Sequence, residues 1–310
     1  MRLPTGLSAT LLVFSINGHA AVTCGLTGSP VLDFGTPDPF TGGNITSNAT
    51  LNWSCTKDSP GQPSFTLCFY VSPDASGNID PRYLLNGGAQ TLPFNVYSDP
   101  TYTSVMQPTV DGFPVIVNMP NKGPNTVSGS ITLYGSLPGP LPPDIQTGLH
   151  QTTMINSQVH IVPGSSANAC SSTKTAPDNI YTLTAQMNVP NQCQLTATDL
   201  DFGTQATPLA QTDSQSTITV RCTNNTPFTV GLNGGLTGNR EMTNGTDLVS
   251  YELYQDPARN QLWDNTGNRQ SGTGLGTGSA ILLNVFGRLP ADPLAAPGTY
   301  TDTVTVDVSF

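Results

Sequence analysis

The sequence contains little charge, and most of that charge is acidic. Only 10% of its 310 residues are Asp, Glu, Lys or Arg, against roughly 25% in an average globular protein. Its 10 basic residues are scattered, so no cluster of them could neutralise the phosphates of a nucleic acid. The sequence therefore predicts no nucleic-acid partner, and the net charge of −10 favours solubility.

Long apolar runs and clusters of metal-binding side chains are also scarce. No run beyond the N-terminus approaches the ~18 apolar residues of a membrane helix, so no membrane span is expected. The six cysteines form no C-x-x-C pair, and His150 and His160 accompany no nucleophile motif. We therefore expect no catalytic residue, no metal and no cofactor, and predict that the protein is not an enzyme.

The N-terminus has the features of a secretory signal. Arg2 precedes a largely apolar segment, residues 7–16, and small residues lie at 18 and 20. We expect residues 1–20 to be a signal peptide that directs export through the periplasm. An even number of cysteines in an exported chain indicates disulfides.

Glycine and proline are abundant, with 31 and 27 copies, and both disfavour helix interiors. Between them lie short runs in which apolar and polar residues alternate, for example residues 65–71, 228–232 and 304–310. Such period-two runs, separated by turn residues, are typical of antiparallel β-sandwiches. The predicted fold is all-β, with tandem β-sandwich domains.

An internal repeat defines the two domains. The segment Leu-Asp-Phe-Gly-Thr occurs at residues 32–36 and again at 200–204. Each copy follows a cysteine and precedes an alternating segment that ends in Cys-Thr. Because the period is about one domain, the repeat indicates a duplicated domain rather than a solenoid. The expected domains are residues 21–189 and 190–310.

The repeat also favours one set of disulfides. Six cysteines can pair in many ways, and sequence alone leaves the pairing open. The repeat makes Cys24–Cys55 and Cys193–Cys222 equivalent pairs, which leaves Cys68–Cys170 as a bridge of the first domain alone.

The two copies differ at their ends. The first copy continues into an alternating segment that could close its own sandwich, because period two puts every apolar side chain on one face. Its apolar residues are Tyr181, Leu183, Ala185, Met187 and Val189. The second copy has no such segment, so we expect it to lack its final strand. It would then expose a groove that a strand from another chain can fill.

Only about three residues separate the expected cleavage site from Cys24. A subunit that donates its own N-terminal strand needs a longer alternating extension. The chain is therefore expected to accept a strand without donating one, which fits the terminal position of a fibre.

These residues together resemble the spore coat protein U domain, which builds archaic chaperone–usher (Csu-type) pili. The resemblance rests on residues 200–203, 251–257 and 298–306 with the terminal Phe310. It implies that both sandwiches are Ig-like and that the second lacks its final strand. It also implies three assembly partners: a periplasmic chaperone, an outer-membrane usher and a neighbouring subunit that donates an N-terminal strand. The strand that contacts chaperone and usher would carry Val304, Val306, Val308 and Phe310.

Two tandem domains of this kind resemble a tip adhesin, which implies attachment to an abiotic or host surface, and biofilm formation, at the cell surface. Apolar loops of the first domain are the candidates for this contact, with buried packing as the alternative. They contain Phe113, Val115, Ile116 and Val117, and Leu137, Pro138, Pro140 and Leu141. Two other functions remain open: a non-adhesive fibre or coat subunit, and a secreted enzyme acting on polysaccharide.

Overall fold

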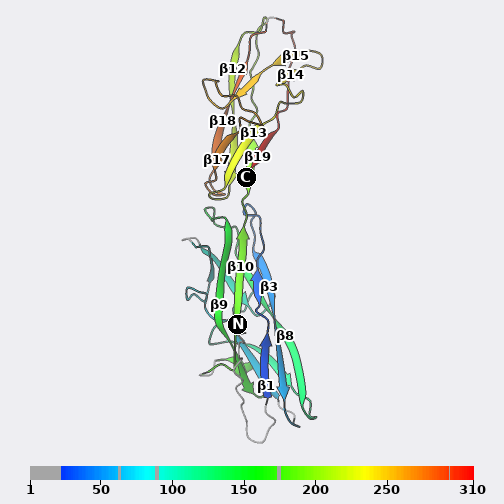
Figure 1. The fold of residues 1–310 in the computed structure, drawn as a ribbon, viewed down its shortest axis with the longest axis vertical. Coiled ribbons are helices and arrows are strands. Elements are labelled where there is room, and N and C mark those ends of the chain that lie inside the picture. The colour runs from blue at the N-terminus through cyan, green and yellow to red at the C-terminus, as the bar shows by residue number, and fades with distance from the viewer. Residues whose placement is uncertain (1–21, 62–63, 88–90, 173–175, 293) are drawn as a thin grey trace, which may run out of the picture. The chain divides into compact units, whose positions relative to one another are not determined.

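The computed structural model describes residues 22–61, 64–87, 91–172, 176–292 and 294–310. The predicted signal peptide lies outside these residues. The described chain is all-β, as expected, apart from the short 3-10 turn η1 (Ala167–Cys170) (Figure 1). No helix in this part of the chain is long and apolar enough to cross a membrane.

The chain divides into two compact units. The first unit contains residues 22–37, 41–140 and 149–188 of the described chain, and the second contains residues 189–310. Two short segments, Asp38–Phe40 and Leu141–Gly148, group with the second unit. The expectation of two domain regions is thus confirmed, and each unit is described by itself below.

The strands of the first unit form a sheet in the order β1-β3-β8-β6-β5-β9-β10-β2, with β4 paired to both β7 and β9. The strands are β1 (Val22–Thr27), β2 (Val31–Asp33), β3 (Ile45–Lys57), β4 (Ser64–Tyr70), β5 (Arg82–Leu85), β6 (Thr91–Tyr97), β7 (Phe113–Asn118), β8 (Asn125–Leu137), β9 (Gly148–Pro163) and β10 (Asn179–Val189).

The segment β10 is a buried strand of this sheet and lies between β9 and β2. Its five inward-facing apolar residues, Tyr181 to Val189 in steps of two, are all at most 6% exposed. It runs parallel to β2, with Ala185 opposite Leu32. Because it covers this edge, Leu32 and Phe34 are 0% and 5% exposed.

The strands of the second unit form separate sheets with the orders β11-β12-β18-β16, β17-β13-β19 and β14-β15. They are β11 (Cys193–Ala197), β12 (Thr212–Cys222), β13 (Pro227–Leu232), β14 (Glu241–Thr243), β15 (Leu248–Ser250), β16 (Glu252–Tyr254), β17 (Gln270–Thr273), β18 (Ile281–Leu289) and β19 (Val306–Ser309).

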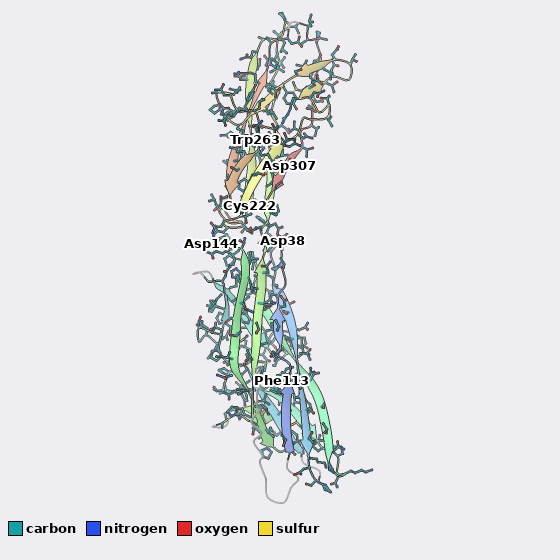
Figure 2. The ribbon with its side chains drawn as sticks, viewed as in Figure 1. Asp38, Phe113, Asp144, Cys222, Trp263 and Asp307 are labelled. Atoms are coloured by element: carbon teal, nitrogen blue, oxygen red, sulfur yellow. A yellow bond between two sulfur atoms is a disulfide. The ribbon has the colours of Figure 1, made fainter. Side chains whose placement is uncertain are left out.

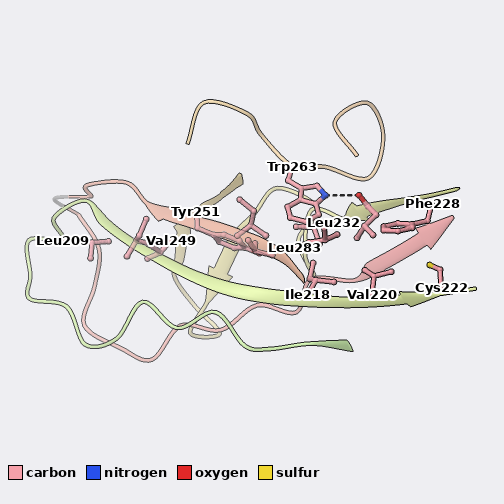
Figure 3. Packing of buried hydrophobic residues seen from close by; sticks show 14 residues of the cluster. Leu209, Ile218, Val220, Cys222, Phe228, Leu232, Val249, Tyr251, Trp263 and Leu283 are labelled. Atoms are coloured by element: carbon pink, nitrogen blue, oxygen red, sulfur yellow. Dashed lines mark hydrogen bonds between the residues drawn. The ribbon is translucent and has the colours of Figure 1, made fainter. Parts of the chain in front are cut away.

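The core of the second unit is built around Trp263, which is 1% exposed. Its indole Nε1 donates a 2.9 Å hydrogen bond to the carbonyl oxygen of Val230, so the one polar atom of the ring is satisfied (Figure 3). Apolar residues of β12, β13 and β18 pack in the same cluster.

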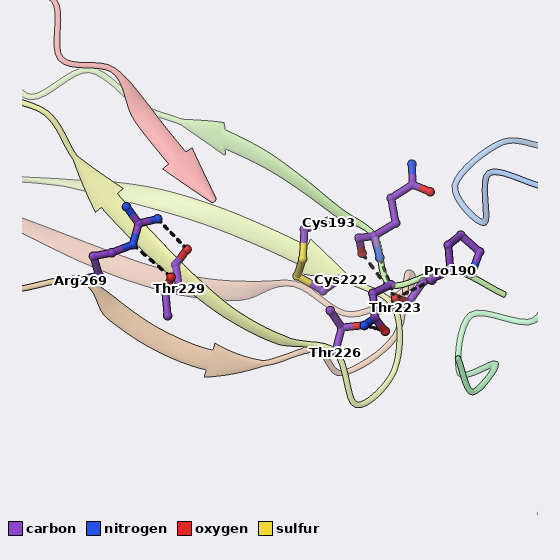
Figure 4. Close-up of a disulfide and its surroundings, with 9 residues drawn as sticks. Pro190, Cys193, Cys222, Thr223, Thr226, Thr229 and Arg269 are labelled. Atoms are coloured by element: carbon purple, nitrogen blue, oxygen red, sulfur yellow. Dashed lines mark hydrogen bonds between the residues drawn. A yellow bond between two sulfur atoms is a disulfide. The ribbon is translucent and has the colours of Figure 1, made fainter. Parts of the chain in front are cut away.

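The disulfides follow the repeat. Cys24–Cys55 joins β1 to β3, and Cys193–Cys222 joins β11 to β12, in each case between directly opposite residues of an antiparallel pair (Figure 4). Cys68–Cys170 belongs to the first unit alone and ties η1 to β4. These are the pairs that the repeat favours.

Burial of β10 predicts a large effect of a charge placed on its inner face. We expect Leu183→Asp to lower the free energy of unfolding of the first unit by more than about 3 kcal/mol, because it buries an unpaired carboxylate. Thr182→Asp, on the opposite face of the strand, is the matched control and should cost less than about 1 kcal/mol. Urea unfolding measures both, and equal effects would contradict the burial of this strand.

Candidate functional site

The second unit lacks the cover that β10 gives the first. The counterparts of Leu32 and Phe34 in the repeat are Leu200 and Phe202. Both are only half-buried, and residues 200–202 form no strand. The same sequence motif is therefore a buried, paired strand in one unit and an open edge in the other.

A hollow of about 450 Å³ lies along this open edge. It is lined by residues 200–207 and 295–300, with Leu209, Met242, Val249 and Leu289. Apolar side chains make up much of this lining, and the hollow is open to solvent.

The last strand of the second unit, β19, follows the lining residues 295–300 in the sequence. Among the described residues it pairs only with β13, from Leu232 opposite Val306 to Thr229 opposite Ser309. Val304, Val306 and Val308 are half-buried against the core, and Phe310 is 54% exposed. Arg269 holds this strand through an ion pair with Asp307. Asp307 is labelled in Figure 2.

The segment that precedes β19 is held by a polar cluster around Asp302. The Asp302 carboxylate accepts a 2.8 Å hydrogen bond from the backbone N–H of Leu236 and another from the Tyr251 hydroxyl. The carboxylate fits closely against Gly235, where an added Cβ would lie 1.8 Å from Oδ2. Burial and the bond to Asp302 raise the pKa of Tyr251 above its ordinary value, so the hydroxyl stays protonated.

Arg240 lies beside this cluster and is 8% exposed. Its Nη2 donates to the carbonyl oxygens of Leu232 and Trp263 at 2.7 and 3.0 Å. The guanidinium thus ties the end of β13 to the loop that contains Trp263, and these hydrogen bonds compensate part of the cost of burying the charge.

The first unit has the same arginine but a different acid. Arg82 is 0% exposed, and its guanidinium donates to four backbone carbonyls, those of Val71, Ser72, Ile79 and Met106. Burial lowers its pKa to about 10. In the repeat, Thr152 of β9 takes the place of Asp302, and the carboxylate comes from Asp74 in the preceding loop, where the second unit has Gly235.

Sequence reasoning missed these arginines. The available signal was that each copy contains one arginine at the same position of the repeat, in a chain with few basic residues. What it could not supply is the convergence of carbonyl groups on the guanidinium, which only the fold brings together.

The apolar candidates of the first unit lie in two places. Phe113–Val117 forms most of β7, paired to β4 with Phe113 opposite Phe69 (Figure 2). Val117 is buried and Ile116 is 47% exposed, whereas Phe113 and Val115 are half-buried. The edge strand β7 therefore exposes one large apolar side chain, Ile116, and partly exposes Phe113 and Val115.

The second candidate segment is mostly buried. Leu137, the last residue of β8, is 0% exposed and Leu141 is 4% exposed, while Pro138 and Pro140 are exposed. The structure does not bring the two segments together. Gly135, just before Leu137, packs against Phe34 near the carboxyl end of β10. Strand β7 instead pairs with β4, and β4 pairs with the part of β9 that adjoins the amino end of β10.

These features define a chain of two related all-β units, one with a covered edge and one with an open edge. The family model described as the Spore Coat Protein U domain matches residues 10–154 and 179–307. The chain belongs to the Spore Coat Protein U domain family, with two such regions.

Two known proteins show the range of this likeness. Protein U of Myxococcus xanthus is 41% identical over 76 residues, which are 23% of this chain and 40% of that protein's length. The fold matches CsuE in the crystal structure of the CsuC–CsuE chaperone–tip adhesion subunit pre-assembly complex, from archaic chaperone–usher Csu pili of Acinetobacter baumannii. The TM-score is 0.55 at 20% identity, over 93% of this chain and 100% of the other. This second likeness concerns the fold alone.

The Asp302 cluster predicts a specific loss of stability in the second unit. Asp302→Asn removes the charge that the Leu236 amide and the Tyr251 hydroxyl share, so we expect a cost of about 1–3 kcal/mol. Asp199→Asn, at an exposed position of the same unit, is the control for net charge. Hydrogen exchange at residues 298–303 measures the effect, and equal exchange in both variants would contradict the anchoring role.

Proposed function

We propose that the chain is the tip subunit of an archaic-type chaperone–usher pilus. In this proposal both domains are Ig-like sandwiches, residues 21–189 form a self-complete adhesin domain, and residues 190–310 form a pilin domain that lacks its final strand. The observation that carries it is the contrast between the covered edge at Leu32 and Phe34 and the open, hollow edge at Leu200 and Phe202.

An open edge of this kind is unfavourable in water, because it exposes apolar side chains and unpaired backbone groups. A strand from another chain removes both costs, as in donor-strand complementation. We assign this role first to a periplasmic chaperone, which contacts the strand of Val304, Val306, Val308 and Phe310. At an outer-membrane usher, the N-terminal strand of the next subunit then replaces it.

The first unit is free for adhesion because its own strand β10 completes it. We assign the surface contact to β7 and in particular to Ile116, which is exposed on an edge strand. Attachment of the pilus tip to an abiotic or host surface, and biofilm formation, would follow from this contact. The proposed role is structural and adhesive and involves no catalysis.

Co-expression tests the assembly role. The mature chain produced alone in an oxidising periplasm should aggregate or be degraded, whereas co-expression with the cognate chaperone should give a soluble one-to-one pair. Val306→Asp should abolish the pair, because it puts a charge at the strand interface, while Thr305→Asp on the exposed face should keep it. A stable monomer that needs no partner would contradict the proposal.

A separate test addresses adhesion. Ile116→Asp should reduce attachment of piliated cells to the target surface at least about tenfold, because it removes the largest exposed apolar group of β7. Ile155→Asp is the matched control, since Ile155 is 59% exposed on β9 of the same unit. Pili should assemble normally in both. Equal attachment of the two variants would show that β7 is not the contact surface.

A further inference from the structure

The way in which β10 covers the edge of the first unit indicates how a strand would cover the equivalent edge of the second unit. Two contacts fix how β10 lies against β9: the backbone N–H of Asp178 donates to the carbonyl oxygen of Val159, and Gln151 Nε2 donates to Gln186 Oε1. Along the chain the two contacts run in opposite directions, so the strands are antiparallel, and the Gln151–Gln186 contact places Met187 beside His150. The carboxyl end of β10 thus lies at the start of β9.

The other side of β10 gives the same placement. The backbone N–H of Phe34 donates to the Gln186 carbonyl oxygen, and that of Asn188 donates to the Gly35 carbonyl oxygen, at 2.8 and 2.9 Å. The last apolar residues of β10, Met187 and Val189, therefore lie between the start of β9 and residues 34–35.

The hollow of the second unit occupies the equivalent place. The repeat aligns Tyr300 with His150, and Phe202 and Gly203 with Phe34 and Gly35. Tyr300, Phe202 and Gly203 all line the hollow. His150 is 0% exposed in the first unit, whereas Tyr300 is half-buried in the second. What the second unit lacks at this end are the counterparts of Met187 and Val189.

The opposite end of the edge differs, because the second unit fills it with its own ring. The backbone N–H of Trp263 donates to Leu253 as that of Met106 donates to Val96, so the two residues are counterparts. In the first unit the Tyr181 hydroxyl donates to the carbonyl oxygen of Tyr70, on β4.

In the second unit the larger Trp263 indole donates to Val230, the residue before the counterpart of Tyr70. Trp263 is 1% exposed. Little room is then left for a second large ring at the position equivalent to Tyr181.

We propose that the strand that completes the second unit carries its largest apolar side chains at its carboxyl end, at the positions of Met187 and Val189, and a small residue at the position of Tyr181. This strand runs parallel to residues 198–203 and antiparallel to β19, as β10 runs against β2 and β9. The inference rests on the proposed function, because it specifies the partner strand of that same open edge.

The test appends a copy of residues 179–190 to Phe310 of the full mature chain through a flexible Gly/Ser linker. The two units stay intact, because every substitution is made in the appended copy. One variant carries Met187→Ala with Val189→Ala, and its matched control carries Tyr181→Ala with Leu183→Ala. Amide hydrogen exchange at residues 298–303 reports how well the open edge is covered.

The appended strand should raise protection of these amides. Met187→Ala with Val189→Ala should lower the protection of these amides at least about tenfold relative to the unchanged appended strand. Precipitation of this variant counts as the same loss. Tyr181→Ala with Leu183→Ala should lower the same protection less than about threefold. A larger loss in this control would overturn the inference and leave the proposed function standing. If no appended strand raised protection, the proposed function itself would be contradicted.

Discussion

The structure of the first unit depends on one interaction: a further strand covers the apolar edge next to the Leu-Asp-Phe-Gly segment. In the first unit β10 provides this cover, and Leu32 and Phe34 are buried beneath it. In the second unit the same motif faces a hollow of about 450 Å³. Because burial of apolar area is the main favourable term in folding, the two units differ in how much of their stability they supply themselves.

The second unit holds its last strand and the segment before it with polar contacts. Asp302 ties the chain ahead of β19 to Leu236 and Tyr251, and Arg269 grips β19 through Asp307. Charge-assisted hydrogen bonds of this kind are directional, so they hold a strand in register without covering its apolar side. The terminal strand is therefore held in place by polar contacts.

Much of this architecture could be predicted from the sequence. Period-two alternation and the long repeat predicted an all-β chain with two domain regions, and the repeat favoured the cysteine pairs that the structure contains. The alternation from Tyr181 to Val189 identified the strand that became β10. Such patterns are readable because a strand places alternate side chains on opposite faces.

Other features were not readable in the same way. For Leu137 and Leu141, in a proline-rich stretch, the sequence left open an exposed loop or buried packing. Both are buried, and the sequence could not decide this because burial depends on what packs against a turn. Arg82 and Arg240 were not predicted from the sequence, because only the fold brings backbone carbonyls around them. The position of the hollow likewise required the two units to be compared residue by residue in three dimensions.

The most direct test of the account compares equivalent amides of the two units in one hydrogen-exchange experiment on the purified chain. The account predicts that residues 32–36 exchange at least about a hundredfold more slowly than residues 200–204, because only the first set is covered by a strand. Equal protection of the two segments in the isolated chain would mean that the second unit is already complete, and would contradict the account.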